Sequence, residues 1–238
     1  MNILFICGSL NQTKMMHQIS LYLEDKYNCY FTPYYADGLE GFLAKRGLLD
    51  FTVLGGSFKR NTEIYLEQNG LRVDYKGERE NYDLVLTCSD LIIPKNIRKK
   101  KIVLVQEGMT DKENIFFYLS KYLGLPRYLA STSTTGLSDA YETFCVASEG
   151  YKELFVRKGC KAEKIRVTGI PNFDNCRLYK KNSFMYRNYV LVCTSDVRET
   201  LKYENRKRFI QKALKIAGHS QLIFKLHPNE NFERAIKE

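Results

Sequence analysis

Polar residues that could do chemistry follow the first apolar run of the chain. Residues 8–14 place Ser9, Asn11 and Thr13 in front of a helical pattern. Free backbone amides at a helix N-terminus, with hydroxyls beside them, can bind an anion. The stretch matches neither the Walker phosphate-binding pattern nor the glycine spacing of a dinucleotide-binding fold. It therefore predicts either a ligand-binding loop or an ordinary strand-to-helix turn with its N-cap.

A second group of polar residues follows the most apolar run, residues 101–106. Glu107 and Asp111 come after this run, and in open parallel sheets ligands bind at the carboxyl ends of the strands. A carboxylate at such a place can act as a general base or accept hydrogen bonds from sugar hydroxyls. The alternative is that both carboxylates only cap the next helix. The hydroxyl-rich stretch 131–136 could also contact a polar ligand, although an ordinary surface turn is the simpler interpretation.

A third group follows the apolar run 189–193. Thr194 and Ser195 offer hydroxyls, and Arg198 and Glu199 follow them. A guanidinium suits a phosphate and a carboxylate suits a hydroxyl. These residues repeat, late in the chain, the strand-then-polar order of the first part.

The last apolar run, residues 221–226, ends in a cation, an imidazole and a proline. Lys225 and His227 are two residues apart, so that in a strand both side chains lie on the same face. Pro228 ends the strand by removing a backbone donor. The pair predicts either a site for an anion or a simple strand terminus, since a lone histidine is usually structural.

The elements that must position these residues alternate between strands and helices. We expect strands at residues 2–7, 29–32, 82–88, 101–106, 143–146, 165–170, 189–193 and 221–226, with 51–54 as a further candidate. We expect helices at residues 14–26, 39–49, 61–69, 115–123, 148–158, 198–217 and 231–238. Ser148 is the expected N-cap of the helix at 148–158, and Gly159 is its expected stop. Near-continuous apolar runs are typical of strands that a parallel sheet buries on both faces. The order predicts an α/β protein with two Rossmann-like, doubly wound parallel sheets.

A break in the pattern divides the chain into two predicted domains. Gly169 permits a tight turn and Pro171 stops the preceding strand. We expect an N-terminal domain at 1–172, a polar linker at 173–188, and the start of a second domain at 189–238. The second sheet is expected to be incomplete, because two strands cannot bury themselves. Either the chain is a fragment of a longer protein, or this piece packs onto the first domain.

Composition indicates a soluble globular protein of 238 residues, 44% hydrophobic and 27% charged. No apolar run reaches the roughly 18–20 residues of a membrane span, and the first residues do not resemble a secretory signal, so we expect a cytoplasmic protein. Seven cysteines stand singly, which favours reduced thiols and no metal site. The net charge of +10 favours anionic partners, but its spread along the chain is typical of solvated surface and disfavours nucleic acid.

Three short motifs, residues 164–171, 190–194 and 225–228, give the chain a family likeness. Together they resemble two-domain nucleotide-sugar enzymes of the GT-B architecture, namely glycosyltransferases and UDP-N-acetylglucosamine 2-epimerases, and Lys-x-His-Pro also resembles wall-polymer glycerophosphotransferases. The resemblance implies an N-terminal acceptor domain, a C-terminal domain that grips the nucleotide diphosphate, and a cleft between them.

Two motifs depart from the epimerase pattern. Residues 196–200 stand where epimerases carry His-Arg-x-Glu-Asn, and they lack the histidine; residues 8–12 replace an early Gly-x-Arg-Pro-Glu. Both departures count against epimerase chemistry. The region that usually holds the nucleotide's phosphates would lie beyond Glu238.

The resemblance implies glycosyl transfer from a nucleotide-activated sugar in bacterial-type surface polysaccharide or glycan synthesis, with the sugar nucleotide as substrate and no further cofactor. Glu107 would deprotonate the acceptor, and cations including His227 would stabilise the departing diphosphate. The expected substrate-binding residues are Ser9, Asn11, Thr13, Asp111, Thr194, Ser195, Arg198, Glu199 and Lys225. An anionic or lipid-linked acceptor at the membrane surface fits the basic charge. The alternatives are an epimerase-like enzyme and a non-catalytic module that binds nucleotide sugars.

Overall fold

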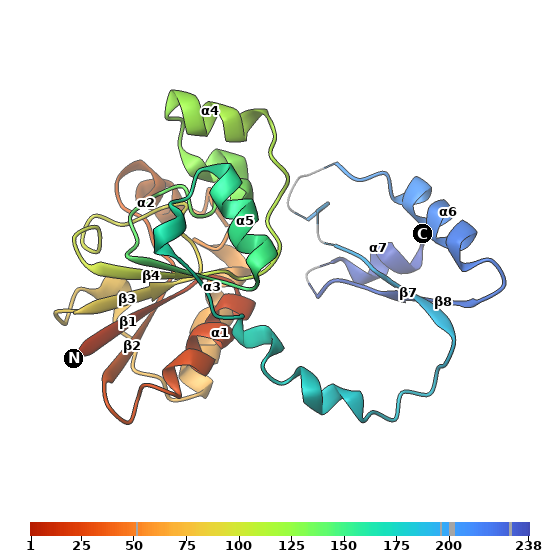
Figure 1. The fold of residues 1–238 in the computed structure, drawn as a ribbon, viewed down its shortest axis with the longest axis horizontal. Coiled ribbons are helices and arrows are strands. Elements are labelled where there is room, and N and C mark those ends of the chain that lie inside the picture. The colour runs from red at the N-terminus through yellow and green to blue at the C-terminus, as the bar shows by residue number, and fades with distance from the viewer. Residues whose placement is uncertain (51, 196, 200–202, 229) are drawn as a thin grey trace. The chain divides into compact units, whose positions relative to one another are not determined.

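The chain folds, in a computed structural model that describes residues 1–50, 52–195, 197–199, 203–228 and 230–238, into two compact units. Unit 1 comprises Met1–Arg177 and unit 2 comprises Leu178–Glu238 (Figure 1). The division falls inside the segment 173–188 that the sequence marks as a polar linker. Each unit is described by itself.

Unit 1 is built on a six-stranded sheet in which every neighbouring pair of strands is parallel. The strand order is β2-β1-β3-β4-β5-β6. The strands are β1 (Asn2–Cys7), β2 (Asn28–Pro33), β3 (Leu84–Thr87), β4 (Lys101–Val105), β5 (Thr143–Val146) and β6 (Ile165–Val167).

Helices connect these strands and cover the sheet. The α-helices are α1 (Leu10–Ser20), α2 (Gly38–Lys45), α3 (Gly56–Gln68), α4 (Ile115–Leu123) and α5 (Glu149–Lys158). Short 3-10 helices are η1 (Tyr75–Gly77), η2 (Arg127–Thr134), η3 (Ala162–Lys164) and η4 (Pro171–Phe173). The predicted cap of α5 is confirmed, because the Ser148 side chain accepts a hydrogen bond from the Tyr151 amide and Gly159 ends the helix in a left-handed conformation.

Apolar side chains bury both faces of the sheet. Leu4 and Ile6 of β1 belong to one buried cluster, which includes Phe155 of α5. Ile3 and Phe5 belong to the other, which α1 and α3 cover with residues such as Met15 and Leu66. Successive residues of a strand point to opposite faces, so an uninterrupted apolar run is what a doubly covered sheet requires.

The strand order reverses its direction at one point of the sheet. From β1 the chain passes to β2 on one side, and it then returns to β3 on the other side of β1. In open parallel sheets such a switch point opens a crevice outside the carboxyl ends of the strands, where ligands bind. The loops after β1, β3 and β4 are therefore the ones to search for a site in unit 1.

Unit 2 holds a two-stranded parallel sheet of β7 (Tyr189–Cys193) and β8 (Gln221–Lys225). The helix α6 (Arg206–Ala217) connects the two strands and contacts both, and α7 (Phe232–Ile236) follows them. The short η5 (Cys176–Lys180) spans the boundary between the units. No helix among the described residues is long and apolar enough to cross a membrane.

Local hydrogen bonds move two helix starts away from the sequence-based predictions, and one predicted strand is a turn. The helix predicted at 14–26 begins at Leu10, because Ser9 forms a capping box with Gln12. The helix predicted at 198–217 begins at Arg206, where Asn205 accepts a hydrogen bond from the Arg208 amide. The candidate strand 51–54 is wrong for residues 52–54, which form a turn, and Phe51 lies outside the described residues.

Candidate functional site

Glu107 lies after β4, and its carboxylate accepts hydrogen bonds from side chains at the N-terminal end of α1. Its Oε1 accepts hydrogen bonds from Ser9 Oγ at 3.1 Å and from Asn11 Nδ2 at 3.2 Å. Its Oε2 accepts one from Gln12 Nε2 at 2.5 Å. The carboxylate is half-buried, and all three donors are uncharged. The carboxyl ends of β1 and β4, which flank β3, are thus joined at the switch point.

The cap of α1 fixes these donors in place. Ser9 Oγ accepts a hydrogen bond from the Gln12 amide at 3.3 Å, and Gln12 Oε1 accepts one from the Ser9 amide at 3.3 Å. Gln12 therefore uses its carbonyl oxygen for the cap and its amide nitrogen for Glu107. A Cβ at Gly8 would overlap the Gln12 carboxamide, so this glycine leaves the space that Gln12 occupies.

Thr13 faces away from this loop. It is fully buried, and its Oγ1 donates to the Ser9 carbonyl at 2.8 Å and lies 3.0 Å from Thr62 Oγ1 of α3. Thr62 in turn donates to the Gly8 carbonyl at 2.8 Å. The structure places Thr13 in the contact between α1 and α3, where it supports the backbone of the loop.

Buried thiols lie at the carboxyl ends of β1 and β3. Burial raises the pKa of Cys88, and the nearby charge of Glu107 raises it further. Burial also raises the pKa of Cys7, although a hydrogen bond to Thr13 partly opposes the shift. Both thiols are therefore neutral at ordinary pH and unsuited to act as nucleophiles.

Asp111 links the loop after β4 to η2. The Asp111 amide donates to Thr132 Oγ1 at 2.9 Å, and Thr132 Oγ1 donates to Asp111 Oδ2 at 3.0 Å. Beside them, Lys158 of α5 is buried and donates to Thr110 Oγ1 at 3.1 Å and to the Ser133 carbonyl at 3.0 Å. Burial lowers the pKa of Lys158, and the charges of acidic neighbours including Asp111 oppose that shift.

Asp90, which sequence reasoning missed, organises the hydroxyl-rich stretch 131–136. It is 1% exposed, and its carboxylate accepts hydrogen bonds from the amides of Gly136, at 3.0 Å, and Ser138, at 3.1 Å. In the same stretch Ser131 has φ 52° and ψ −148°, a conformation that residues with a side chain rarely adopt. Asp90 stands three residues after β3, and that position at a strand end is the signal that could have identified it.

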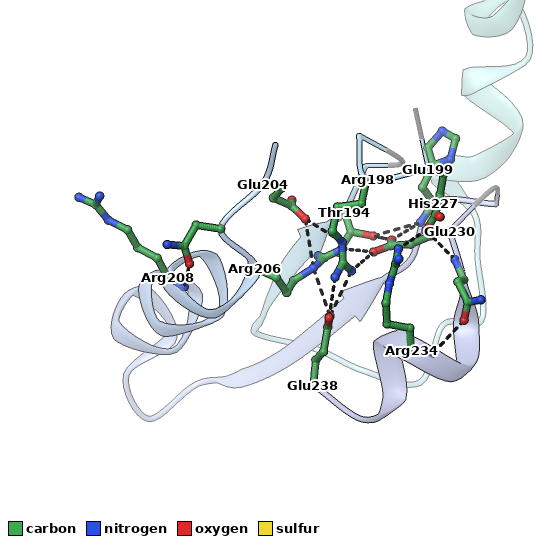
Figure 2. A network of polar contacts seen from close by, with 12 residues as sticks. Thr194, Arg198, Glu199, Glu204, Arg206, Arg208, His227, Glu230, Arg234 and Glu238 are labelled. Carbon is green, nitrogen blue, oxygen red and sulfur yellow. Dashed lines mark hydrogen bonds and ion pairs between the residues drawn. The ribbon is translucent and has the colours of Figure 1, made fainter. Parts of the chain in front are cut away.

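In unit 2, the third group of polar residues forms a network of ion pairs (Figure 2). The side chain of Glu230 is buried and accepts hydrogen bonds from Arg206, from Thr194 Oγ1 and, at 3.2 Å, from Arg198. Arg198 also pairs with Glu238 at 2.5 Å. The sequence pattern missed Glu230, because the side chains that donate to it lie at least 24 residues away and form no local motif.

The pairing of Arg198 and Glu238 stabilises both charges. The hydrogen bond to Glu238 raises the pKa of Arg198, and the hydrogen bond from Arg198 lowers the pKa of Glu238. Arg198 also lies 3.3 Å from a carboxylate oxygen of Glu204. The guanidinium that the sequence suggested for a phosphate is thus surrounded by carboxylates of its own unit.

The remaining predicted residues of unit 2 lie around this network. Glu199 accepts from the guanidinium of Arg234 and from the Asn231 amide at 3.1 Å. The His227 amide donates to Thr194 Oγ1 at 3.1 Å.

Two further predicted residues of unit 2 are exposed. Ser195 follows β7, and Lys225 is the last residue of β8. The epimerase-motif position 196 lies outside the described residues. The described residues contain no group of three or more His, Cys, Asp or Glu side chains placed to hold a metal ion.

The structure therefore brings some of the predicted residues together in each unit. Ser9, Asn11 and Glu107 meet in unit 1, and Thr194, Arg198 and the His227 backbone meet around Glu230 in unit 2. Gln12 was not among the predicted residues, although its spacing from Ser9 is that of a capping box.

No protein-family model matches the sequence, and no curated protein matches it. Among solved structures the chain is similar to UDP-N-acetylglucosamine 2-epimerase from Rickettsia bellii, with 12% identity and a TM-score of 0.51 over 100% of this chain and 63% of that chain. It is also similar to UDP-GlcNAc 2-epimerase from Methanocaldococcus jannaschii, with 17% identity and a TM-score of 0.44 over 100% and 68%. A third similar structure is Anabaena Alr3699/HepE in complex with UDP and glucose, with 12% identity and a TM-score of 0.43 over 95% and 69%.

The likeness to the Rickettsia bellii protein bears on the fold. It confirms the predicted class, an α/β protein of GT-B-like type with a parallel Rossmann-like sheet and a second, two-stranded parallel sheet. The chain spans 63% of the length of that protein.

Proposed function

We propose that this chain acts on a nucleotide-activated sugar and takes part in glycosyl transfer. The observation that carries the proposal is Glu107, which Ser9, Asn11 and Gln12 hold at the carboxyl ends of β1 and β4. A carboxylate fixed beside the switch point of an α/β sheet is suitably placed for acid–base chemistry on a bound ligand. The fold likeness to a UDP-N-acetylglucosamine 2-epimerase and the three sequence motifs support a sugar nucleotide as the ligand.

In this proposal Glu107 is the general base. It takes the proton from an acceptor hydroxyl while that oxygen bonds to the anomeric carbon and the nucleotide diphosphate leaves. An ionised carboxylate offers about four lone-pair sites, and the three hydrogen bonds to Glu107 leave room for the acceptor hydroxyl. Because the donors are neutral, no ion pair competes with the proton that the carboxylate must accept.

Unit 2 would bind the leaving group in this proposal. Lys225, exposed at the end of β8, and the His227 side chain would stabilise the negative charge that develops on the diphosphate. Arg198 and Glu199 would act indirectly, since their ion pairs with Glu230 and Arg234 order the turn that carries His227. Thr194 and Ser195 would contribute hydroxyls.

The proposed acceptor is a lipid-linked molecule at an anionic membrane, as in surface polysaccharide synthesis. Helix α4 exposes large apolar and aromatic side chains, among them Ile115, Phe116 and Tyr122, with exposed fractions of 65%, 46% and 69%. Exposed lysines, Lys112 and Lys121, lie on the same segment, and the chain carries a net charge of +10. Aromatic side chains flanked by cations are typical of surfaces that meet an anionic membrane.

The test compares two isosteric substitutions in the loop after β4. We expect Glu107→Gln to lower kcat for release of nucleotide diphosphate by about 10²–10⁴-fold, the range typical of a lost general base, with little change in KM. Glu113→Gln, in an exposed residue of the same loop, should leave kcat unchanged. The measurement is free nucleotide diphosphate released from a panel of UDP-sugars in the presence of acceptor.

The same assay separates the alternatives. If the chain is a binding module, added UDP-sugar will protect it from thermal unfolding, but no diphosphate will be released. An epimerase would change the sugar's C2 signals in proton NMR without an acceptor. Equal activity of Glu107→Gln and the unsubstituted chain would remove Glu107 from the mechanism.

A further inference from the structure

An open cavity of about 480 Å³ lies in the outer layer of unit 1. It is formed by the start of α2, by the connection between β3 and β4, and by the start of η2. The residues of the Glu107 cluster are not part of its wall. Its volume falls within the roughly 300–1,000 Å³ that small-molecule sites occupy, so it can be considered as a separate site.

Two guanidinium groups line this cavity, and each has N–H donors beyond the one used in the contact described next. Arg127 uses Nη2 to donate to the Asp90 carbonyl at 2.9 Å, while its Nε is buried without a hydrogen-bond partner. Arg98 uses Nε to donate to the Ile93 carbonyl at 2.9 Å. Both arginines contact backbone carbonyls, and the ion pairs found among the described residues include neither of them. Guanidinium groups recognise carboxylate and phosphate, so each arginine can bind an oxyanion through the nitrogens that these contacts do not use.

Two carboxylates also belong to the wall of the cavity. Asp37 accepts a hydrogen bond from the Lys95 amide at 2.6 Å. Glu40 lies beside the Tyr128 hydroxyl, where burial and then the charge of Glu40 raise the pKa of Tyr128. Each carboxylate offers more acceptor sites than these contacts use. Hydroxyl groups of a ligand are the donors that such acceptors bind.

The rest of the wall is partly apolar. Leu91, Ile92, Pro94 and Pro126 contribute to it. An apolar wall with a few polar groups at fixed places is the usual composition of a small-molecule site. The cavity thus combines cations for an oxyanion, acceptors for hydroxyls, and an apolar surface for the carbon face of a ring.

We propose that this cavity binds an acidic sugar, with its phosphate or carboxylate group on Arg98 and Arg127 and its hydroxyls on Asp37 and Glu40. The proposal goes beyond the function proposed above and does not rest on it. Phosphate and carboxylate present the same oxyanion geometry to a guanidinium, so the two kinds of acidic sugar are separated by the experiment.

The experiment is isothermal titration calorimetry of the whole chain with glucose 6-phosphate, with glucuronate and with neutral glucose. We expect at least one of the acidic sugars to bind, and glucose to bind at least about tenfold more weakly, because it lacks the charged group. Arg98→Gln and Arg127→Gln should each weaken that binding by about tenfold or more, since each removes a charge-assisted contact. Arg157→Gln removes an exposed arginine of α5 outside the cavity and should leave the affinity unchanged.

Further arms keep the result interpretable. Arg127 also donates a hydrogen bond to the Asp90 carbonyl, so the folding of each variant is checked by thermal unfolding. Arg98 is exposed, and Arg98→Gln is therefore the deciding variant if Arg127→Gln is unstable. Glu107→Gln should bind the acidic sugar as the unsubstituted chain does, which separates this site from the proposed catalytic one. The proposal is overturned if neither acidic sugar binds below about 10 mM, if Arg98→Gln has no effect, or if Arg157→Gln weakens binding equally.

Discussion

Glu107 and Glu230 show how the partners of a carboxylate determine what it can do. Glu107 is half-buried, and its donors among the described residues are the neutral side chains of Ser9, Asn11 and Gln12, so it keeps acceptor capacity for a substrate. Glu230 is buried and paired with two guanidinium groups. A carboxylate of the second kind stabilises the fold around it and has little capacity left for a ligand.

Replacing Glu230 should loosen unit 2. Glu230→Gln leaves the guanidinium groups of Arg198 and Arg206 without their buried partner, and breaking a buried pair typically costs about 3–5 kcal/mol. We expect the amides of β7 and β8 to exchange with solvent much faster, as measured by hydrogen exchange and mass spectrometry. Glu238→Gln, in a more exposed partner of the same arginines, should have a much smaller effect. Unchanged exchange in Glu230→Gln would show that the network does not support the sheet.

Replacing Ser131 with glycine should stabilise the folded protein. Its φ of 52° with ψ of −148° costs about 1–3 kcal/mol in a residue with a Cβ, whereas glycine loses roughly 0.4–1 kcal/mol through the entropy of the unfolded chain. We therefore expect Ser131→Gly to raise the free energy of unfolding by about 1 kcal/mol in urea denaturation. Ser131→Ala keeps the Cβ and should give no gain. A loss of stability in Ser131→Gly would contradict the strain.

At the scale of elements, capping residues set where helices begin and packing decides which face is covered. α4 begins and ends where the sequence pattern predicts, with Asn114 as its N-cap and Gly124 as its C-cap. Its buried residues are Phe117 and Ser120, so most of its apolar side chains face outward. The periodicity of the helix shows an apolar surface, but it does not show what covers that surface.

We expect the exposed face of α4 to bind anionic vesicles. Phe116→Ser combined with Tyr122→Ser removes two exposed aromatic rings and should lower the affinity for phosphatidylglycerol vesicles in co-sedimentation by about 10²-fold, because each buried side chain contributes about 1.5–3 kcal/mol. Leu214→Ser combined with Ile216→Ser, at exposed apolar positions of α6, is the matched control. Equal binding to zwitterionic vesicles, or no effect of the α4 substitutions, would count against this surface. A change in oligomeric state instead would indicate that a second copy covers it.

At the scale of the whole molecule, the two units differ in how much core each contains. Unit 1 holds the six-stranded sheet and both large buried clusters, whereas unit 2 holds two strands. A two-stranded sheet with few helices buries little apolar surface and is marginal by itself. Stability should therefore be unevenly distributed along the chain.

Limited proteolysis should cut first within residues 173–188. This segment is largely exposed and contains the division between the units, and exposed polar connections are the usual sites of cleavage. We expect an N-terminal fragment close to residues 1–177 that keeps its circular dichroism and cooperative unfolding. First cleavage within the sheet of unit 1, identified by mass spectrometry, would place the boundary elsewhere.

Local sequence patterns were enough to predict most elements and the fold class. Uninterrupted apolar runs predicted strands such as Asn2–Cys7 and Thr143–Val146 at their observed bounds, and Ser148 with Gly159 predicted the limits of α5. These signals are local, since they depend on a few neighbouring residues and on the burial of both faces of a parallel sheet. The alternation of strands and helices was sufficient to predict the fold class.

Which polar residues meet depends on how the elements pack against one another. Glu107 and Ser9 are 98 residues apart, and they meet because the strand order places β1 and β4 on either side of β3. Arg198 was a candidate phosphate ligand by sequence, and its carboxylate partners Glu230 and Glu238 lie 32 and 40 residues further along the chain. Such contacts depend on how elements pack after they form, and local patterns carry no information about that arrangement.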